Sequence, residues 1–223
     1  MKKFELTNEF ITNMFGTKLF RIRALVEFGD VEAGELGGYV EKESNLGHDD
    51  NAWVYDNAWV YGDAQVSGDA RVYDNAWVYG DAQVSGDAWV YGDAQVSGDA
   101  RVYGDAQVSG NARVYDNALV YDNAWVYGNA LVCGDARVCG NGDYAYAHGF
   151  GSVNRTTTFF RLKDGGVGVR CGCFYGTLAQ FRDKIRETHG ETKKAQEYLM
   201  LADLMELRFE EDENEVGNRK YVE

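Results

Sequence analysis

The chain has few basic residues and no proline. Its 223 residues include 22 Lys and Arg against 36 Asp and Glu, which gives a net charge of −14. Nucleic-acid backbones and anionic membrane surfaces require clustered basic side chains, so neither is expected as a general partner. An anionic ligand would have to bind where the local charge differs from that of the whole chain.

Long apolar segments are also missing. The first ten residues, MKKFELTNEF, contain no continuous apolar stretch, and nowhere do eighteen apolar residues follow one another. Secretion and membrane spanning are therefore not signalled. The four Cys residues do not resemble a disulfide framework, and free thiols fit a reducing compartment. We therefore expect a cytoplasmic protein, in which 45% hydrophobic residues supply a packed core.

The dominant feature of the sequence is a repeat. From Asn51 to Gly140 it reads as fifteen units of six residues, each running Asn or Asp, Ala, variable, Val, variable, Gly or Asp. The rows of Ala and Val have no exception. Because Ala and Val are two residues apart, a strand points both to one side and the residue between them to the other. The Gly, Asp and Asn residues at each junction favour a bend.

The repeat predicts a mainly β fold, a single-stranded parallel β-helix of hexapeptide repeats with three units per coil. Five coils would enclose a narrow interior of Val and Ala, and all eleven Phe indeed lie outside the repeat. The repeat residues leave the handedness open. Open ends of a solenoid need caps, so we divide the chain into an N-terminal strand and cap at 1–50, the β-helix at 51–140, and a C-terminal cap at 141–223.

The flanks show ordinary secondary-structure signals. Residues 18–28 alternate as a strand, and residues 154–162 and 167–174 flank Lys163-Asp164-Gly165-Gly166 as a β-hairpin. Thr177 precedes a helical pattern that stops at Gly190, and a second helix is expected over 195–207. The acidic run at 210–215 is interpreted as a solvated tail.

Residues eighteen apart stack on one side of the coil, and the repeat places five Trp and nine Tyr on the outside. Large aromatic patches favour interfaces, so we expect a homo-oligomer, a trimer or a multiple of it. Stacked ladders within one chain and a ligand-stacking surface are the alternatives. The corner Asp residues are assigned to turn chemistry rather than to a metal site. The predicted interface residues are Trp53, Tyr55, Trp89, Tyr91, Trp125 and Tyr127.

The segment 144–176 carries a local charge of +3 within this acidic chain. Arg side chains bind phosphate or carboxylate through two parallel hydrogen bonds, and Tyr144, Tyr146 or Phe150 offer stacking for a base. The candidate ligand is a small molecule that carries a phosphate. The alternative is that these Arg and Thr side chains are ordinary solvent-exposed residues of the hairpin. The predicted ligand-binding residues are His148, Arg155, Thr157, Arg161 and Arg170.

Histidine is absent from the ninety repeat residues. A hexapeptide acyltransferase needs a base beside its nucleophile, so such chemistry is possible only at the ends, with His148 as the base and acyl-CoA as the donor. The Cys171-Gly172-Cys173 pair lacks the further ligands that zinc requires. We interpret both thiols as buried small hydrophobes.

The run RIRALVEFGDVEAGELGGYVEKESNLG, followed by NAWVYDNAWVYGDA, resembles the entrance of YdcK-like hexapeptide-repeat proteins of bacteria and their phages. Members carry transferase or polymer-forming labels. The resemblance covers residues 18–140 and implies a left-handed β-helix that is oligomeric. A transferase label that rests on fold analogy is weak support for chemistry.

These observations predict a non-enzymatic, oligomeric β-helix that acts as a binding module. It would sequester a small anionic, nucleotide-like ligand or a host factor, without a cofactor, and the resemblance suggests a phage-encoded protein. An acyl-CoA-dependent acyltransferase and a purely structural, polymer-forming protein are the alternatives.

Overall fold

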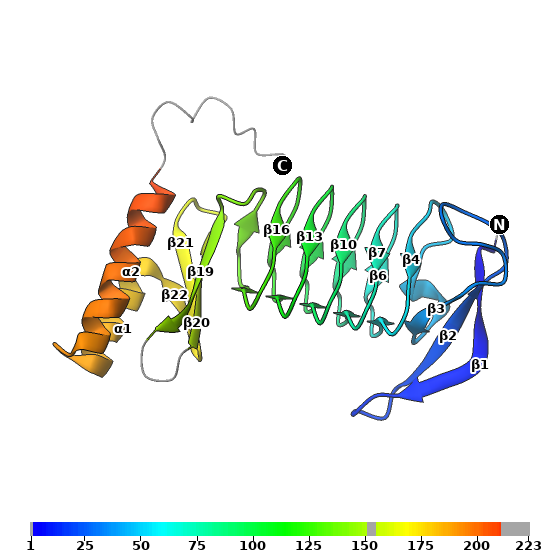
Figure 1. The fold of residues 1–223 in the computed structure, drawn as a ribbon, viewed down its shortest axis with the longest axis horizontal. Helices are drawn as coiled ribbons and strands as arrows, with labels where there is room; N and C mark the ends of the chain where they lie inside the picture. The colour runs from blue at the N-terminus through cyan, green and yellow to red at the C-terminus, as the bar shows by residue number, and fades with distance from the viewer. Residues whose placement is uncertain (1, 151–154, 211–223) are drawn as a thin grey trace.

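A computed structural model describes residues 2–150 and 155–210. The molecule is elongated, with a β-hairpin at its N-terminal end, a stack of coils in the middle, and a small sheet covered by two helices at the other end (Figure 1). The predicted parallel β-helix with a cap at each end is confirmed. The predicted acidic tail lies outside the described residues except for Glu210.

Each six-residue unit forms one short strand, made of the outward residue and its Val. The strands are β4 (Trp53–Val54), β5 (Trp59–Val60), β6 (Gln65–Val66), β7 (Arg71–Val72), β8 (Trp77–Val78), β9 (Gln83–Val84), β10 (Trp89–Val90), β11 (Gln95–Val96), β12 (Arg101–Val102), β13 (Gln107–Val108), β14 (Arg113–Val114), β15 (Leu119–Val120), β16 (Trp125–Val126), β17 (Leu131–Val132) and β18 (Arg137–Val138). They form three parallel walls that contain β4-β7-β10-β13-β16, β5-β8-β11-β14-β17 and β6-β9-β12-β15-β18. Trp89 pairs with Arg71 on one side and Gln107 on the other, so three units complete one coil as predicted.

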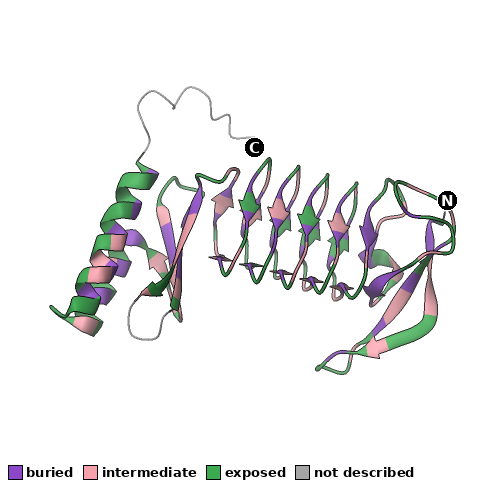
Figure 2. Ribbon diagram, in the orientation of Figure 1, coloured by how far each residue is buried: buried purple, intermediate pink, exposed green. Residues whose placement is uncertain are grey.

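The interior of the coils is built from the two invariant rows. Every Ala and every Val of the fifteen units is completely buried. The residues between them are partly or fully exposed along most of the solenoid. Buried and exposed residues therefore alternate along each coil (Figure 2). Two side chains of this size fill a narrow bore at the packing density of a protein core, which leaves no space for a larger residue.

The corners require an unusual backbone conformation. The residue that opens each turn has a positive φ, such as 67° at Gly98 and 59° at Asp74. L-residues rarely adopt this conformation, but Asp side chains compensate by bonding to the next coil. The Asp74 carboxylate accepts the N–H of Gly92 at 3.0 Å. The corner acids therefore act in turns, as the sequence predicts.

The N-terminal cap extends the solenoid beyond the repeat. The antiparallel strands β1 (Phe4–Thr12) and β2 (Lys18–Ala24) lead to β3 (Leu36–Val40), which pairs in parallel with β5. A short 3-10 helix, η1 (Glu43–Asn45), follows, and Leu46 then bridges to Val66. A further partial coil outside the repeat thus forms the first turn. A β-carbon at Gly37 would lie 2.5 Å from the Val54 carbonyl oxygen, so only glycine fits where this coil closes.

The cap also covers the first wall. Trp53 is completely buried, with its ring 6.2 Å from Phe4 and 5.3 Å from Phe28 between centroids. The prediction that Trp53 lies in an exposed interface is therefore wrong. Its neighbour Tyr55 donates its hydroxyl hydrogen to Asp30 at 2.9 Å.

A buried lysine in this cap makes stability depend on pH. The Lys3 ammonium donates to the carbonyl oxygens of Asp50 and Ala52 at 3.2 and 2.8 Å, and burial lowers the pKa of Lys3 from 10.5 to about 8. The unfolded chain therefore holds this proton above pH 8 while the folded protein releases it, so stability rises with pH in that window. We measure the free energy of unfolding by urea denaturation at pH 8 and at pH 9. Between these two pH values, it should rise by about 1 kcal/mol more in the wild type than in Lys3→Met. Parallel pH profiles for the two proteins would contradict this.

The C-terminal cap is a four-stranded antiparallel sheet with two helices. Its strands are β19 (Tyr144–Phe150), β20 (Arg155–Arg161), β21 (Val167–Cys171) and β22 (Phe174–Thr177), in that order. β20 and β21 form the predicted hairpin. The outer strands β19 and β22 are additional to it.

The sheet lies between the last coil and the helices. On one face, the Thr158 hydroxyl accepts the N–H of Leu131 in the last coil at 2.9 Å. On the other face, Phe159 and Val169 pack against the helices. Helix α1 (Leu178–His189) starts at Thr177, whose hydroxyl accepts the Gln180 N–H, and ends at Gly190 as predicted. Helix α2 (Lys193–Phe209) starts two residues before the predicted position, because Thr192 caps it.

Within the described residues, no helix has the length and apolar composition needed to cross a membrane.

Candidate functional site

The five residues predicted to bind an anion do not form one site, because alternate residues of β20 and β21 point to opposite faces of the sheet. Thr157 lies on the helix face, fully buried, and its hydroxyl donates to the Cys171 sulfur at 3.2 Å. Arg170 lies on the other face, toward Cys133 and Tyr115 of the solenoid, whose pKa values its charge affects. His148 is exposed near the end of β19, with Nδ1 3.0 Å from the Thr156 hydroxyl.

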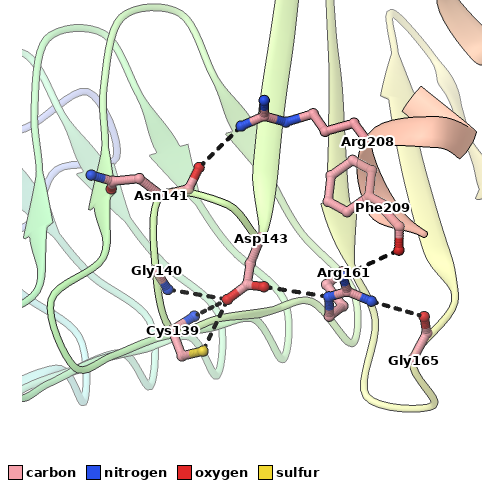
Figure 3. A network of polar contacts seen from close by, with 8 residues as sticks. All are labelled: Cys139, Gly140, Asn141, Asp143, Arg161, Gly165, Arg208 and Phe209. Atoms are coloured by element: carbon pink, nitrogen blue, oxygen red, sulfur yellow. Dashed lines mark hydrogen bonds and ion pairs between the residues drawn. The ribbon is translucent and has the colours of Figure 1, made fainter. Parts of the chain in front are cut away.

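Arg161 joins the solenoid to its cap instead of binding a ligand. It is buried, its Nε lies 3.3 Å from an Asp143 oxygen, and its guanidinium donates to the Phe209 carbonyl at 3.3 Å (Figure 3). The second Asp143 oxygen accepts the backbone N–H groups of Cys139 and Gly140 at 3.0 and 3.1 Å. The assignment of Thr157 and Arg161 to an open anion site is therefore wrong, since both side chains are committed inside the fold.

A cleft of about 620 Å³ opens beside this network, at the junction of the last full coil, β19 and α2. We call it the aromatic cleft. It combines four aromatic rings, one amide and one guanidinium. Its lining consists of Trp125, Tyr127, Asn141, Tyr144, Ala145, Tyr146 and Arg208.

Hydrogen bonds fix two aromatic side chains of this cleft, those of Trp125 and Tyr144. The Trp125 indole N–H donates to the Ser109 hydroxyl at 3.0 Å, and the Trp125 backbone N–H donates to the Asn141 side-chain oxygen at 2.8 Å. Tyr144 donates its hydroxyl hydrogen to the Trp125 carbonyl at 2.7 Å and accepts the Tyr127 N–H at 3.3 Å. Burial raises the pKa of Tyr144 above its usual value, so this hydroxyl stays protonated and keeps its donor role.

The Trp125 and Tyr127 rings of the cleft are open to solvent. Trp125 and Tyr127 are 43% and 45% exposed, with centroids 5.1 Å apart and planes at 46°. Tyr146 meets Tyr127 edge-on, at 6.0 Å and 83°. Because the hydrogen bond to Ser109 holds the Trp125 ring, a flat ligand placed against this ring would not have to order it first.

A cation stands at the rim of the aromatic cleft. Arg208, in the last turn of α2, donates to the Asn141 carbonyl oxygen at 3.4 Å (Figure 3). The aromatic cleft therefore combines a stacking surface with a group that binds phosphate or carboxylate. The sequence indicates the aromatic residues, including Tyr144 and Tyr146 as stacking candidates. It gives no signal for Arg208, which lies 67 residues from Asn141.

Most aromatic side chains on the outside of the solenoid stack on aromatic side chains of neighbouring coils. Tyr73 and Tyr91 are parallel at 5.0 Å, and Trp59 and Trp77 are parallel at 4.8 Å. Such ladders stabilise neighbouring coils, which supports the intrachain alternative for these residues. Of the six predicted interface residues, Trp89, Trp125 and Tyr127 are exposed.

The coils have a recognisable sequence type. A family model described as the YdcK beta solenoid repeat matches residues 64–80, 94–110, 106–122 and 112–128. The coils within these stretches match the YdcK beta-solenoid repeat, and the matched residues cover less than half of the chain. The resemblance inferred at the entrance of the solenoid is thus confirmed within the repeat itself. No curated protein matches the chain significantly.

A second cavity, of about 480 Å³, lies away from the YdcK repeats between the sheet and the helices. Arg155 and Lys184 line it together with His189, whose ring stacks on Tyr198 at 6.0 Å. Burial raises the pKa of Tyr198 to about 12. Arg155 is the one member of the predicted anion set that lines this cavity.

The two neighbouring thiols line the same cavity. Cys171 is half-buried, and Cys173 is exposed. The interpretation of both as buried hydrophobes is therefore wrong for Cys173, which follows the tight turn at Gly172, where φ is 60°.

The three histidines are dispersed around the YdcK repeats. His48 is built into the N-terminal cap: its ring stacks on Phe4 at 4.5 Å and Nε2 lies 2.9 Å from Glu43. His148 and His189 both belong to the C-terminal cap, on β19 and at the end of α1. The acyltransferase alternative therefore depends on His148 and a substrate bound at the cap.

Proposed function

We propose that this protein is a non-enzymatic binding module whose aromatic cleft holds a small anionic ligand with a flat ring, of the nucleotide class. The observation that carries the proposal is the pair of exposed, mutually packed rings of Trp125 and Tyr127 beside Arg208. Aromatic side chains stack on any base, and a guanidinium binds a phosphate through two hydrogen bonds.

Charge supports the location of this site. The chain has a net charge of −14, which repels anions from most of its surface. Among the residues that the structure describes, the lining of the aromatic cleft contains no acidic side chain, and its one charged group is Arg208. An anion meets less repulsion there than along the Asp-rich corners of the solenoid.

The volume of the cleft also suits such a ligand. Small-molecule sites range over about 300–1,000 Å³ and are lined mainly by apolar and aromatic side chains with a few polar groups. The 620 Å³ of the aromatic cleft lies within this range, and Asn141 and Arg208 are its polar groups. The ring of the ligand would lie against Trp125 and Tyr127, and its anionic group would face Arg208.

The test is a calorimetric titration of the full chain with nucleoside monophosphates and the matching nucleosides. Trp125→Ala should weaken nucleotide binding about 5- to 150-fold, the equivalent of one stacking contact of about 1–3 kcal/mol. Arg208→Gln should weaken nucleotide binding but leave nucleoside binding unchanged, because it removes the charge and keeps the ring surface.

Trp89→Ala is the matched control. Trp89 occupies the same wall two coils before Trp125 and is similarly exposed, but it does not line the aromatic cleft. Its replacement should leave the affinity unchanged. Equal losses from Trp89→Ala and Trp125→Ala, or no heat of binding with any nucleotide, would refute the proposed site. Turnover of acetyl-CoA that disappears in His148→Ala would refute the non-enzymatic part and favour the acyltransferase alternative.

A further inference from the structure

Helix α2 exposes a row of large apolar side chains. Ala195, Tyr198, Ala202, Met205 and Phe209 form its buried face against the sheet and α1. On its outer face, Met200, Leu204 and Leu207 are 71%, 54% and 67% exposed. Their spacing of four and then three residues places them in one stripe along the helix. We call these three residues the α2 stripe.

The position of α2 leaves this stripe accessible. The helix forms the C-terminal end of the elongated molecule, on the side of the cap away from the coils (Figure 1), and its exposed residues appear along the helix in Figure 2. Single exposed apolar residues are common, but a contiguous row on one helix marks a contact surface for another protein element.

The charge of α2 favours a second copy of the same chain as that element. Two molecules of net charge −14 repel each other over most of their surface. The helix at 193–209, however, contains three basic and three acidic residues, so its own net charge is zero. Arg182 of α1 further neutralises Asp203 and Glu206, with contacts of 2.9 and 2.7 Å. Copies can therefore approach at this helix more easily than along the solenoid.

The order of charges along α2 selects one arrangement. Lys193 and Lys194 are exposed at the start of the helix, and Arg208 and Glu210 are exposed at its end, where Arg182 already pairs with Asp203 and Glu206. Glu210 is therefore the acid at this end that the contacts with Arg182 do not involve. Lys193 also continues the α2 stripe, seven residues before Met200. In an antiparallel pair, Lys193 of each copy lies near Glu210 of the other, with the apolar residues in the centre. A parallel pair would bring lysines against lysines.

We propose that two copies of this protein associate through an antiparallel pairing of their α2 helices, centred on Met200 and Leu204. The contact is two-fold symmetric, so each copy uses the same surface and the assembly closes at a dimer. This goes beyond the proposed ligand binding, and it assigns self-association to the α2 stripe instead of the aromatic wall. The solenoids then point outward from the paired caps.

The test is the mass of the full chain by light scattering after gel filtration, over a range of concentrations. The wild type should have the mass of a dimer. Leu204→Asp should raise the dimer dissociation constant at least 100-fold and yield monomers with unchanged helical circular dichroism. Trp89→Glu, which places a charge on the exposed aromatic wall, should remain dimeric and is the matched control.

A charge exchange tests the antiparallel register and does not depend on the apolar change. Lys193→Glu should weaken the dimer about tenfold, and adding Glu210→Lys should restore it. A wild-type monomer at all concentrations, a trimer, or dissociation by Trp89→Glu but not by Leu204→Asp would overturn the proposal. Because Leu204 does not line the aromatic cleft, monomeric Leu204→Asp should still bind nucleotide, so the two proposals can fail separately.

Discussion

Replacing Val96 with Asp is expected to abolish the cooperative unfolding transition of this protein. Val96 is completely buried in the middle of the solenoid, paired with Val78 and Val114 in the neighbouring coils. The bore around it consists of Ala and Val side chains, which offer a carboxylate no hydrogen-bond donor. Burying such a group costs at least about 4–5 kcal/mol, close to the whole stability of many domains.

Circular dichroism during heating measures this effect, and Gln95→Asp is its control. Gln95 precedes Val96 in the same strand but points outward, so the same new charge stays in water there. We expect Gln95→Asp to melt within a few degrees of the wild type. A folded Val96→Asp protein with normal melting would mean that the valine row faces solvent, and the coil geometry would have to be abandoned.

Replacing Asp143 with Ala is expected to destabilise the protein by about 3–5 kcal/mol, the usual cost of removing one partner from a buried ion pair. Asp143 and Arg161 are both buried, and the Asp143 carboxylate also receives the N–H groups that end the last coil at Cys139 and Gly140. Its loss removes the group that joins the end of the solenoid to the C-terminal sheet (Figure 3). Urea denaturation gives the free-energy difference.

Asp164→Ala is the matched control, because Asp164 is an exposed acid in the same cap that bonds only locally, to the Gly166 N–H at 3.0 Å. It should change the stability by about 0.5 kcal/mol or less. A double-mutant cycle with Arg161→Met then isolates the coupling between the two charges. Equal effects of Asp143→Ala and Asp164→Ala would show that the buried network contributes no more than a surface turn.

The repeat and several flanking elements were predictable from the sequence. A six-residue period without a break leaves one way to bury Ala and Val together, so the register of eighteen residues follows directly. The hairpin over β20 and β21 and the N-terminus of α1 were also readable, because Thr177 and Gly190 are strong local boundary signals.

The sequence failed where contacts join distant segments. Trp53 carries the same local pattern as the exposed Trp89, yet the N-terminal cap covers it with Phe4 and Phe28. The basic residues of the C-terminal cap were grouped by their sequence proximity, but the pleat of β20 and β21 separates Arg155 from Arg170 on opposite faces. The aromatic cleft needed Arg208, which no pattern near Trp125 indicates.

By itself, the sequence determined that the chain coils, how many residues each coil takes, and which two side chains fill the bore, because these depend on the alternation of neighbouring residues along a strand. The tertiary structure decided which outward side chains stay open, where a cation meets aromatic rings, and that the α2 stripe has no cover within the described chain. Exposure of a side chain depends on what a remote segment places over it, and a local period contains no information about that segment.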